Sequence, residues 1–213
     1  MSFQKNCFSV FVLIITCVFV LQAPVTYGRS SIDLVNAKIN EFPIFELTLD
    51  KVTDLFGRPS VVEPPCIIGE KFGAFLHYHD EGLTFIFFHP ESDKEQHCTG
   101  VSIYLAKKWD KRANRFYGSY AGEILRNVNA KRKAKDVMQT FSDCNPKDLY
   151  NEKEVEAKKK LFRDNDDMLK TSISGYTRVQ ITPPGAKHRV TFEYEETTKF
   201  IEKIAIFLLT KKQ

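Results

Sequence analysis

The chain has 213 residues, 43% of them hydrophobic and 27% charged, and a formal net charge of +4. This composition is typical of a globular protein and excludes a disordered chain; the charge is too small to indicate a nucleic-acid partner. The sequence contains no P-loop, no G-x-G-x-x-G fingerprint, no H-E-x-x-H helix and no G-x-S-x-G nucleophile elbow. It therefore predicts no cofactor and no catalytic residue.

The N-terminus has the zones of a secretory signal segment. Lys5 precedes an apolar run at residues 8–21, and a proline follows the run. Such a run has the length of a signal peptide's apolar region and is short for crossing about 30 Å of hydrocarbon. We expect residues 1–28 to be removed before Arg29, which makes the mature protein secreted or periplasmic. The alternative is that this segment is retained as a membrane anchor.

After an N-terminal segment at residues 29–41, the chain predicts a first module over residues 42–106. It contains a short helix with Thr48 as its N-cap and Gly57 as its stop. A hairpin of two apolar strands and a third strand follow the helix. One face of the helix carries the apolar residues that we expect to be buried: Leu49, Val52, Leu55 and Phe56.

Residues 107–115 are predicted to link this module to a second one over residues 116–210. The second module again has a helix followed by a hairpin and a closing strand. It also has a charged insertion at residues 147–170, for which we expect a solvated helix near 150–163 or, alternatively, a disordered loop. The apolar face of its first helix consists of Ala134, Val137, Met138 and Phe141.

The two halves match in several places, in the same order. The apolar pair Val52 and Phe56 recurs as Val137 and Phe141, and the closing strands read VSIYL and IAIFL. Such matches indicate an internal repeat. The predicted fold is therefore α+β, with two tandem modules that each pack a helix on a small antiparallel sheet.

The first helix has the pattern T-x-x-x-V-x-x-x-F-G-x-P, carried by Thr48, Val52, Phe56, Gly57 and Pro59. With the strands that follow, it resembles the helix-plus-sheet modules of the BamE/SmpA family. The tandem arrangement resembles the secreted β-lactamase inhibitor proteins. The second half departs from the pattern, with Asp143 and Pro146 near the glycine and proline places. The resemblance implies a secreted module that binds another protein and performs no chemistry.

His77 and His79 lie two residues apart on a predicted strand, so they project from the same face. Such a pair can ligate zinc or copper if a third ligand comes from the next strand. His89 ends that strand, but alternation directs it to the other face. We prefer two ordinary histidines on a half-exposed strand. The alternative function is a small extracytoplasmic metal-dependent enzyme or metal-binding protein that uses His77 and His79.

The mature chain keeps Cys66, Cys98 and Cys144. An oxidising compartment permits a disulfide, and an odd number leaves one thiol. Cys66 and Cys98 flank strands of the first module, so they are the candidate pair. Closing this loop would stabilise the fold by about 3–4 kcal/mol.

Strand alternation predicts an apolar outer face on the first module, whereas the outer face of the second is polar. Exposed apolar patches mark interaction sites. The alternative is that the linker, the other module or the insertion covers this face. We expect a secreted or periplasmic, non-enzymatic module of inhibitor, immunity or envelope-accessory type that binds another protein, with a membrane as partner only if the N-terminal segment is retained. The candidate partner-binding residues are His77, His79, Ile86, Phe88 and Tyr104.

Overall fold

In the computed structural model, the described residues are 30–68, 71–89, 96–111, 113–149, 152–161 and 177–209. The predicted signal segment lies outside them. The fold is α+β, with mostly antiparallel strands, as predicted. Among the described residues, no helix is both long and apolar enough to span a membrane.

The elements of the first half are β1 (Ser31–Asp33), β2 (Lys38–Ile39), β3 (Phe42–Pro43), the 3-10 helix η1 (Ile44–Glu46), α2 (Leu49–Phe56), β4 (Val61–Ile68), β5 (Lys71–Tyr78), β6 (Leu83–His89) and β7 (Gly100–Tyr104). The first half thus contains the predicted helix, hairpin and third strand in the predicted order, and in addition β1, β2 and β4, which were not predicted. The remaining elements are β8 (Lys108–Asp110), β9 (Arg115–Tyr117), β10 (Glu123–Ile124), α3 (Ala134–Thr140), η2 (Ser142–Cys144), β11 (Lys147–Asp148), α4 (Glu152–Leu161), β12 (Arg178–Ile181), β13 (His188–Tyr194) and β14 (Ile201–Leu208).

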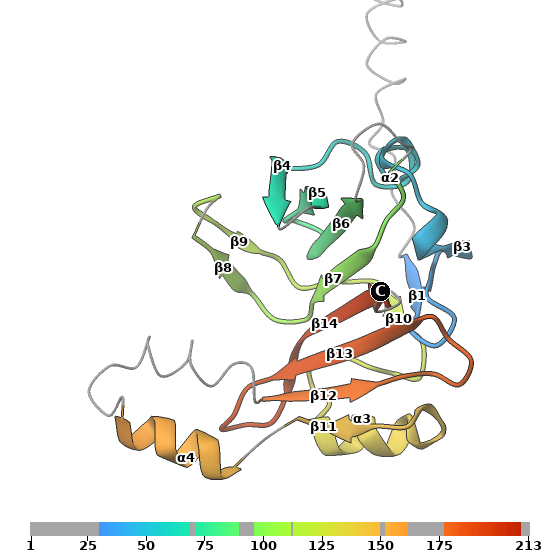
Figure 1. Cartoon of the computed structure of the whole chain (residues 1–213). Helices are drawn as coiled ribbons and strands as arrows, with labels where there is room; N and C mark the ends of the chain where they lie inside the picture. Colours follow the sequence, from blue (N-terminus) through green and yellow to red (C-terminus); the bar gives the residue numbers. More distant parts are fainter. Residues whose placement is uncertain are drawn as a thin grey trace, which may run out of the picture.

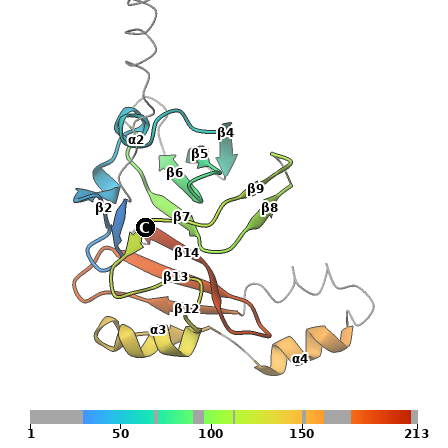
Figure 2. The ribbon, with the colours of Figure 1, turned by 180° about the vertical axis from the view of Figure 1, so that it is seen from behind.

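One large sheet joins the two halves of the chain (Figure 1). Its strand order is β11-β12-β13-β14-β7-β6-β5-β4, and the closing strands of the halves, β7 and β14, pair antiparallel at its centre. The other strands of the described residues form a smaller sheet, β10-β1-β2-β3, and the two-stranded β8–β9 hairpin (Figure 2).

The order of helix, then antiparallel strands, occurs on both sides of the β7–β14 pair. Ser102 pairs with Ala205, the residue that matches it in the alignment of VSIYL with IAIFL. However, the buried residues of both halves form one hydrophobic core. Two separate modules are therefore not confirmed, because the halves share both a sheet and a core.

The first helix begins and ends where the sequence predicts. The Thr48 hydroxyl accepts a hydrogen bond from the Lys51 amide at 3.2 Å, and Gly57 takes φ 74° at the C-cap. Val52 and Phe56 are buried and Leu55 is partly buried. Helix α3 likewise buries Ala134 and Val137, Phe141 just beyond its end is also buried, and Met138 is partly buried.

Helix α4 lies within the predicted charged insertion, close to the expected range 150–163. Most of its described side chains are at least partly exposed, but Val155 is buried. The prediction of a helix is confirmed. Lys159 of this helix lies 2.7 Å from the Glu196 carboxylate, which connects the helix to the segment after β13.

The predicted disulfide is wrong, because Cys98 is a free, buried thiol. Cys66 lies on β4 opposite Gly73 of β5, whereas Cys98 lies beyond β6, just before β7. Three strand spacings of about 4.8 Å separate the cysteines by about 14 Å, twice the separation that a disulfide tolerates. The Cys98 thiol donates to the Gly100 carbonyl at 3.1 Å, and burial raises its pKa to about 12.

Candidate functional site

The predicted linker at residues 107–115 contributes to a hairpin, β8–β9, that lies beside the β4–β6 part of the large sheet (Figures 1 and 2). Trp109 pairs with Phe116, and Asp110 pairs with Arg115. Residues opposite each other on paired strands share a face. The hairpin therefore has one face toward the sheet, with Asp110 and Tyr117, and another with Trp109 and Phe116.

Tyr117 fixes the hairpin to the sheet. Its side chain is buried, and its hydroxyl is hydrogen-bonded to His77 Nδ1 and accepts from Thr84 Oγ1 at 3.2 Å. Its ring stacks on Tyr104, with centroids 3.9 Å apart, and on His79, with centroids 4.3 Å apart. One side chain of the hairpin thus contacts β5, β6 and β7.

Each histidine of the predicted pair faces a different carboxylate. His79 Nε2 lies 3.1 Å from Asp110 Oδ2, and this contact joins the turn after β5 to the hairpin. His77 Nε2 lies 3.3 Å from Glu63 Oε1 on β4. His79 is 0% exposed, so its contact with Asp110 is shielded from solvent.

Further ion pairs lie at the edges of the hairpin. Arg115 contacts Asp80 at 2.9 Å, and Lys108 lies 3.9 Å from Glu193 on β13. These pairs involve exposed groups and contribute little to stability. The position of the hairpin is therefore set by the buried contacts of Tyr117 and His79.

Burial changes the ionisation of this cluster. Desolvation lowers the pKa of His77, against the opposing effects of Glu63 and Asp110. Desolvation raises the pKa of Tyr104 and of Tyr117. At neutral pH, therefore, His77 is an uncharged hydrogen-bonding partner and both phenols keep their protons.

The lowered pKa of His77 predicts a stability loss in acid. The unfolded chain binds the proton at the ordinary histidine pKa of about 6.5, so unfolding is favoured as the pH falls from there toward the lower folded-state pKa. The contribution of His77 is complete above this window and lost below it. Urea denaturation at a series of pH values should show a shallower pH slope in His77→Gln than in the natural protein. Equal slopes would contradict the assignment.

The histidine pair does not form the metal site considered from sequence. The two Nε2 atoms are directed at different carboxylates. In the part of the chain that the structure describes, no group of three or more His, Cys, Asp or Glu residues could hold a metal ion. The side chain of His89 lies outside that part.

The hairpin covers part of the predicted partner-binding face, because Tyr117 contacts His77, His79 and Tyr104. His77, His79 and Ile86 are buried, and Phe88 and Tyr104 are partly exposed. The alternative, that the linker covers this face, therefore holds for the part around the two histidines.

The outer face of the hairpin carries an aromatic pair that sequence reasoning missed. Trp109 is 43% exposed and Phe116 is 56% exposed, and their rings meet edge to face with centroids 4.7 Å apart. The signal available in the sequence was an aromatic residue in each of two short segments, KWD and RFY, on either side of a polar turn. A pocket of about 270 Å³ opens beside the pair, lined by Glu63, His77, Lys108, Trp109, Asp110, Lys111 and Tyr117.

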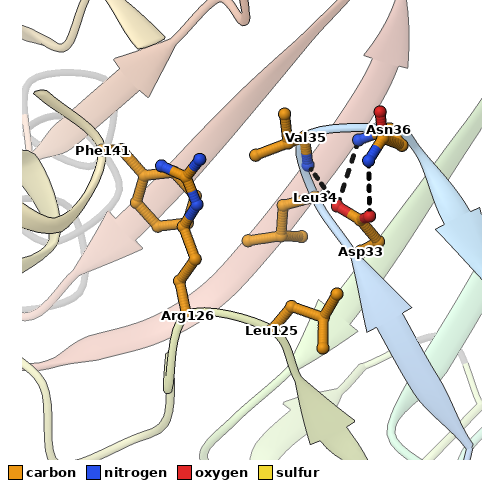
Figure 3. A pocket seen from close by; sticks show the side chains of 7 residues that line it. All are labelled: Asp33, Leu34, Val35, Asn36, Leu125, Arg126 and Phe141. Carbon is orange, nitrogen blue, oxygen red and sulfur yellow. Dashed lines mark hydrogen bonds between the residues drawn. The ribbon is translucent and has the colours of Figure 1, made fainter. Parts of the chain in front are cut away.

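A second hollow, of about 170 Å³, lies between the turn after β1 and the segment after β10 (Figure 3). Its charged groups are already paired. Arg126 binds Asp143 through two contacts of 2.6 and 2.8 Å and lies over the Phe141 ring. The Asp33 carboxylate accepts from the amides of Val35 and Asn36. This hollow therefore offers no available charge for a ligand.

Comparison with known proteins identifies no family. No family model and no curated protein matches the chain. Among solved structures, it is similar to a cysteine-rich secretory protein from Staphylococcus aureus, with 9% identity and a TM-score of 0.40. The match covers 85% of this chain and 52% of that one, so the chain spans about half the length of the structure it matches. A likeness at this level supports no inference about function, and the resemblance to BamE/SmpA modules stays an expectation.

Proposed function

We propose that this chain is an extracytoplasmic, non-enzymatic protein-binding module that docks its partner on the outer face of the β8–β9 hairpin. The observation that carries the proposal is the exposed pair Trp109 and Phe116. Aromatic residues, tryptophan above all, are enriched where interfaces bind most strongly.

The attachment of the hairpin supports this proposal. Tyr117 and Asp110 on its inner face contact buried groups of the sheet, so the outer aromatic pair is held in one orientation before binding. A preorganised surface loses less conformational entropy when it binds. The extracytoplasmic location rests on the apolar run at residues 8–21.

The cluster beneath the hairpin gives less support to the enzymatic alternative. His77 and His79 are engaged with Glu63 and Asp110, and both are buried. We therefore assign them to positioning the hairpin.

The double variant Trp109→Ala/Phe116→Ala should lose partner binding by at least about ten-fold while keeping its fold. The partner is isolated from the secreted or envelope fraction of the source by affinity capture with the natural protein, then titrated against each purified variant by calorimetry. Circular dichroism and urea denaturation report the fold.

The double variant Leu161→Ala/Leu209→Ala is a matched control. It removes two apolar side chains outside the hairpin, which are 74% and 42% exposed. It should bind like the natural protein. Full binding by the Trp109/Phe116 variant, or equal loss in the control, would end the proposal.

A further inference from the structure

We infer that the hairpin surface recognises an acidic segment of its protein partner. This inference rests on the proposed function and specifies the partner's chemistry. Its starting point is the combination of an exposed aromatic pair with a concentration of positive charge on one small hairpin.

The charge of the chain is concentrated at this hairpin. Residues 107–117 contain five basic residues and one acidic residue, a net charge of +4 that equals the net charge of the whole chain. The rest of the sequence is thus neutral in sum. In the fold, Arg115 is paired with Asp80 and Lys108 lies near Glu193, so the positive bias is strongest at Lys107 and Lys111. A local positive field attracts an acidic partner and speeds association.

The geometry increases this bias on the outer side. The one acidic residue, Asp110, is directed inward at His79. Lys107 and Lys111, two residues to either side of Trp109, are exposed. Lys108 pairs with Tyr117, so it takes the inner face and lies 3.9 Å from Glu193. A ligand that covers Trp109 and Phe116 therefore meets ammonium groups at their border.

The pocket beside Trp109 adds a place for a partner side chain. Lys108 and Lys111 contribute to its lining together with Trp109, and so do the carboxylates of Glu63 and Asp110. The pocket itself therefore carries both signs of charge, and the positive bias of the surface comes from Lys107 and Lys111 at its border.

The distribution of apolar residues favours a protein over an anionic bilayer. A membrane-inserting hairpin would carry its apolar residues at the turn, whereas here the turn between Asp110 and Arg115 includes Lys111 and Asn114. The aromatic pair lies one residue pair back from the turn, on the face of the hairpin. Such a face fits an extended or flat protein surface.

Trp109 is the single tryptophan of the chain, so its fluorescence reports directly on this surface. The probe is a synthetic peptide that alternates glutamate with leucine, compared with a peptide that has glutamine in place of glutamate. The acidic peptide should bind at least about ten-fold more tightly, and salt should weaken its binding. Vesicles of phosphatidylglycerol with phosphatidylcholine test whether the surface binds an anionic bilayer instead.

The test variant Lys107→Glu/Lys111→Glu should weaken binding of the acidic peptide by about ten-fold or more. The matched control Lys131→Glu/Lys135→Glu makes the same charge change at exposed positions away from the hairpin and should bind normally. Equal affinity for the two peptides, equal loss in both variants, or binding to vesicles but not to peptide would overturn the inference.

The two pairs of substitutions distinguish a failure of this inference from a failure of the proposed function. If Trp109→Ala/Phe116→Ala abolishes capture of the natural partner but Lys107→Glu/Lys111→Glu does not change it, the hairpin is the docking surface and its partner is not acidic. If neither variant changes capture, the proposed function itself is wrong.

Discussion

Replacing Phe141 with alanine should lower the free energy of unfolding by about 3–5 kcal/mol. The side chain is 0% exposed, and its ring centroid lies 5.8 Å from that of Phe192 on β13. The Arg126 guanidinium covers the ring at 4.9 Å from its centroid. Removal of the ring leaves a cavity between helix α3 and the sheet, in addition to the lost transfer free energy. Urea denaturation followed by circular dichroism measures the change.

The control is Phe200→Ala, because Phe200 lies next to the start of β14 and is 37% exposed. Its loss should change the free energy of unfolding by less than about 1 kcal/mol. Similar effects of the two substitutions would show that Phe141 does not support the core in the way its burial indicates.

The helices were predictable because their signals are local. For α2, a capping threonine, apolar residues at 3–4 spacing and a glycine at the stop lie within ten positions, and all three features act in the structure. Alternation is a local signal as well: along β13, Val190, Phe192 and Tyr194 are buried and the polar residues between them are more exposed.

The joining of the halves was not predictable from the same signals. Successive residues of β7 and of the middle of β14 are buried, so both faces of these two strands are covered there. The sequence of such a strand predicts a central place in a sheet, but it does not predict which strand lies beside it. The sequence repeat identified similar elements, yet their pairing across Ser102 and Ala205 depends on the assembled sheet.

The candidate site was missed because the packing of the β8–β9 hairpin on the sheet depends on the tertiary structure. Strands β8 and β9 have three residues each, too few for a period to be recognised, and their composition is that of a solvated linker. Ile86 was expected to be exposed because alternation says which face a residue takes, not whether that face meets water. Tyr117 covers His77 and Thr84 on that face, and alternation cannot predict this contact.

Tyr117 is the residue on which the position of the hairpin depends most. Its ring is stacked between Tyr104 and His79, and its hydroxyl is hydrogen-bonded to His77 and Thr84. The ring and the hydroxyl can be removed separately, because phenylalanine keeps the stack while alanine loses both.

Tyr117→Ala should therefore destabilise the protein by about 3–4 kcal/mol, through the loss of a buried ring and the cavity that it leaves. Tyr117→Phe should cost about 1–2 kcal/mol, because His77 Nδ1 and Thr84 lose a buried partner. Urea denaturation measures both values, and hydrogen exchange at the amides of β8 and β9 reports whether the hairpin detaches. Faster exchange in Tyr117→Ala, with protection retained in Tyr117→Phe, is the expected pattern. If Tyr117→Ala costs less than about 1 kcal/mol and leaves exchange unchanged, other contacts hold the hairpin, and the docking surface does not depend on this cluster.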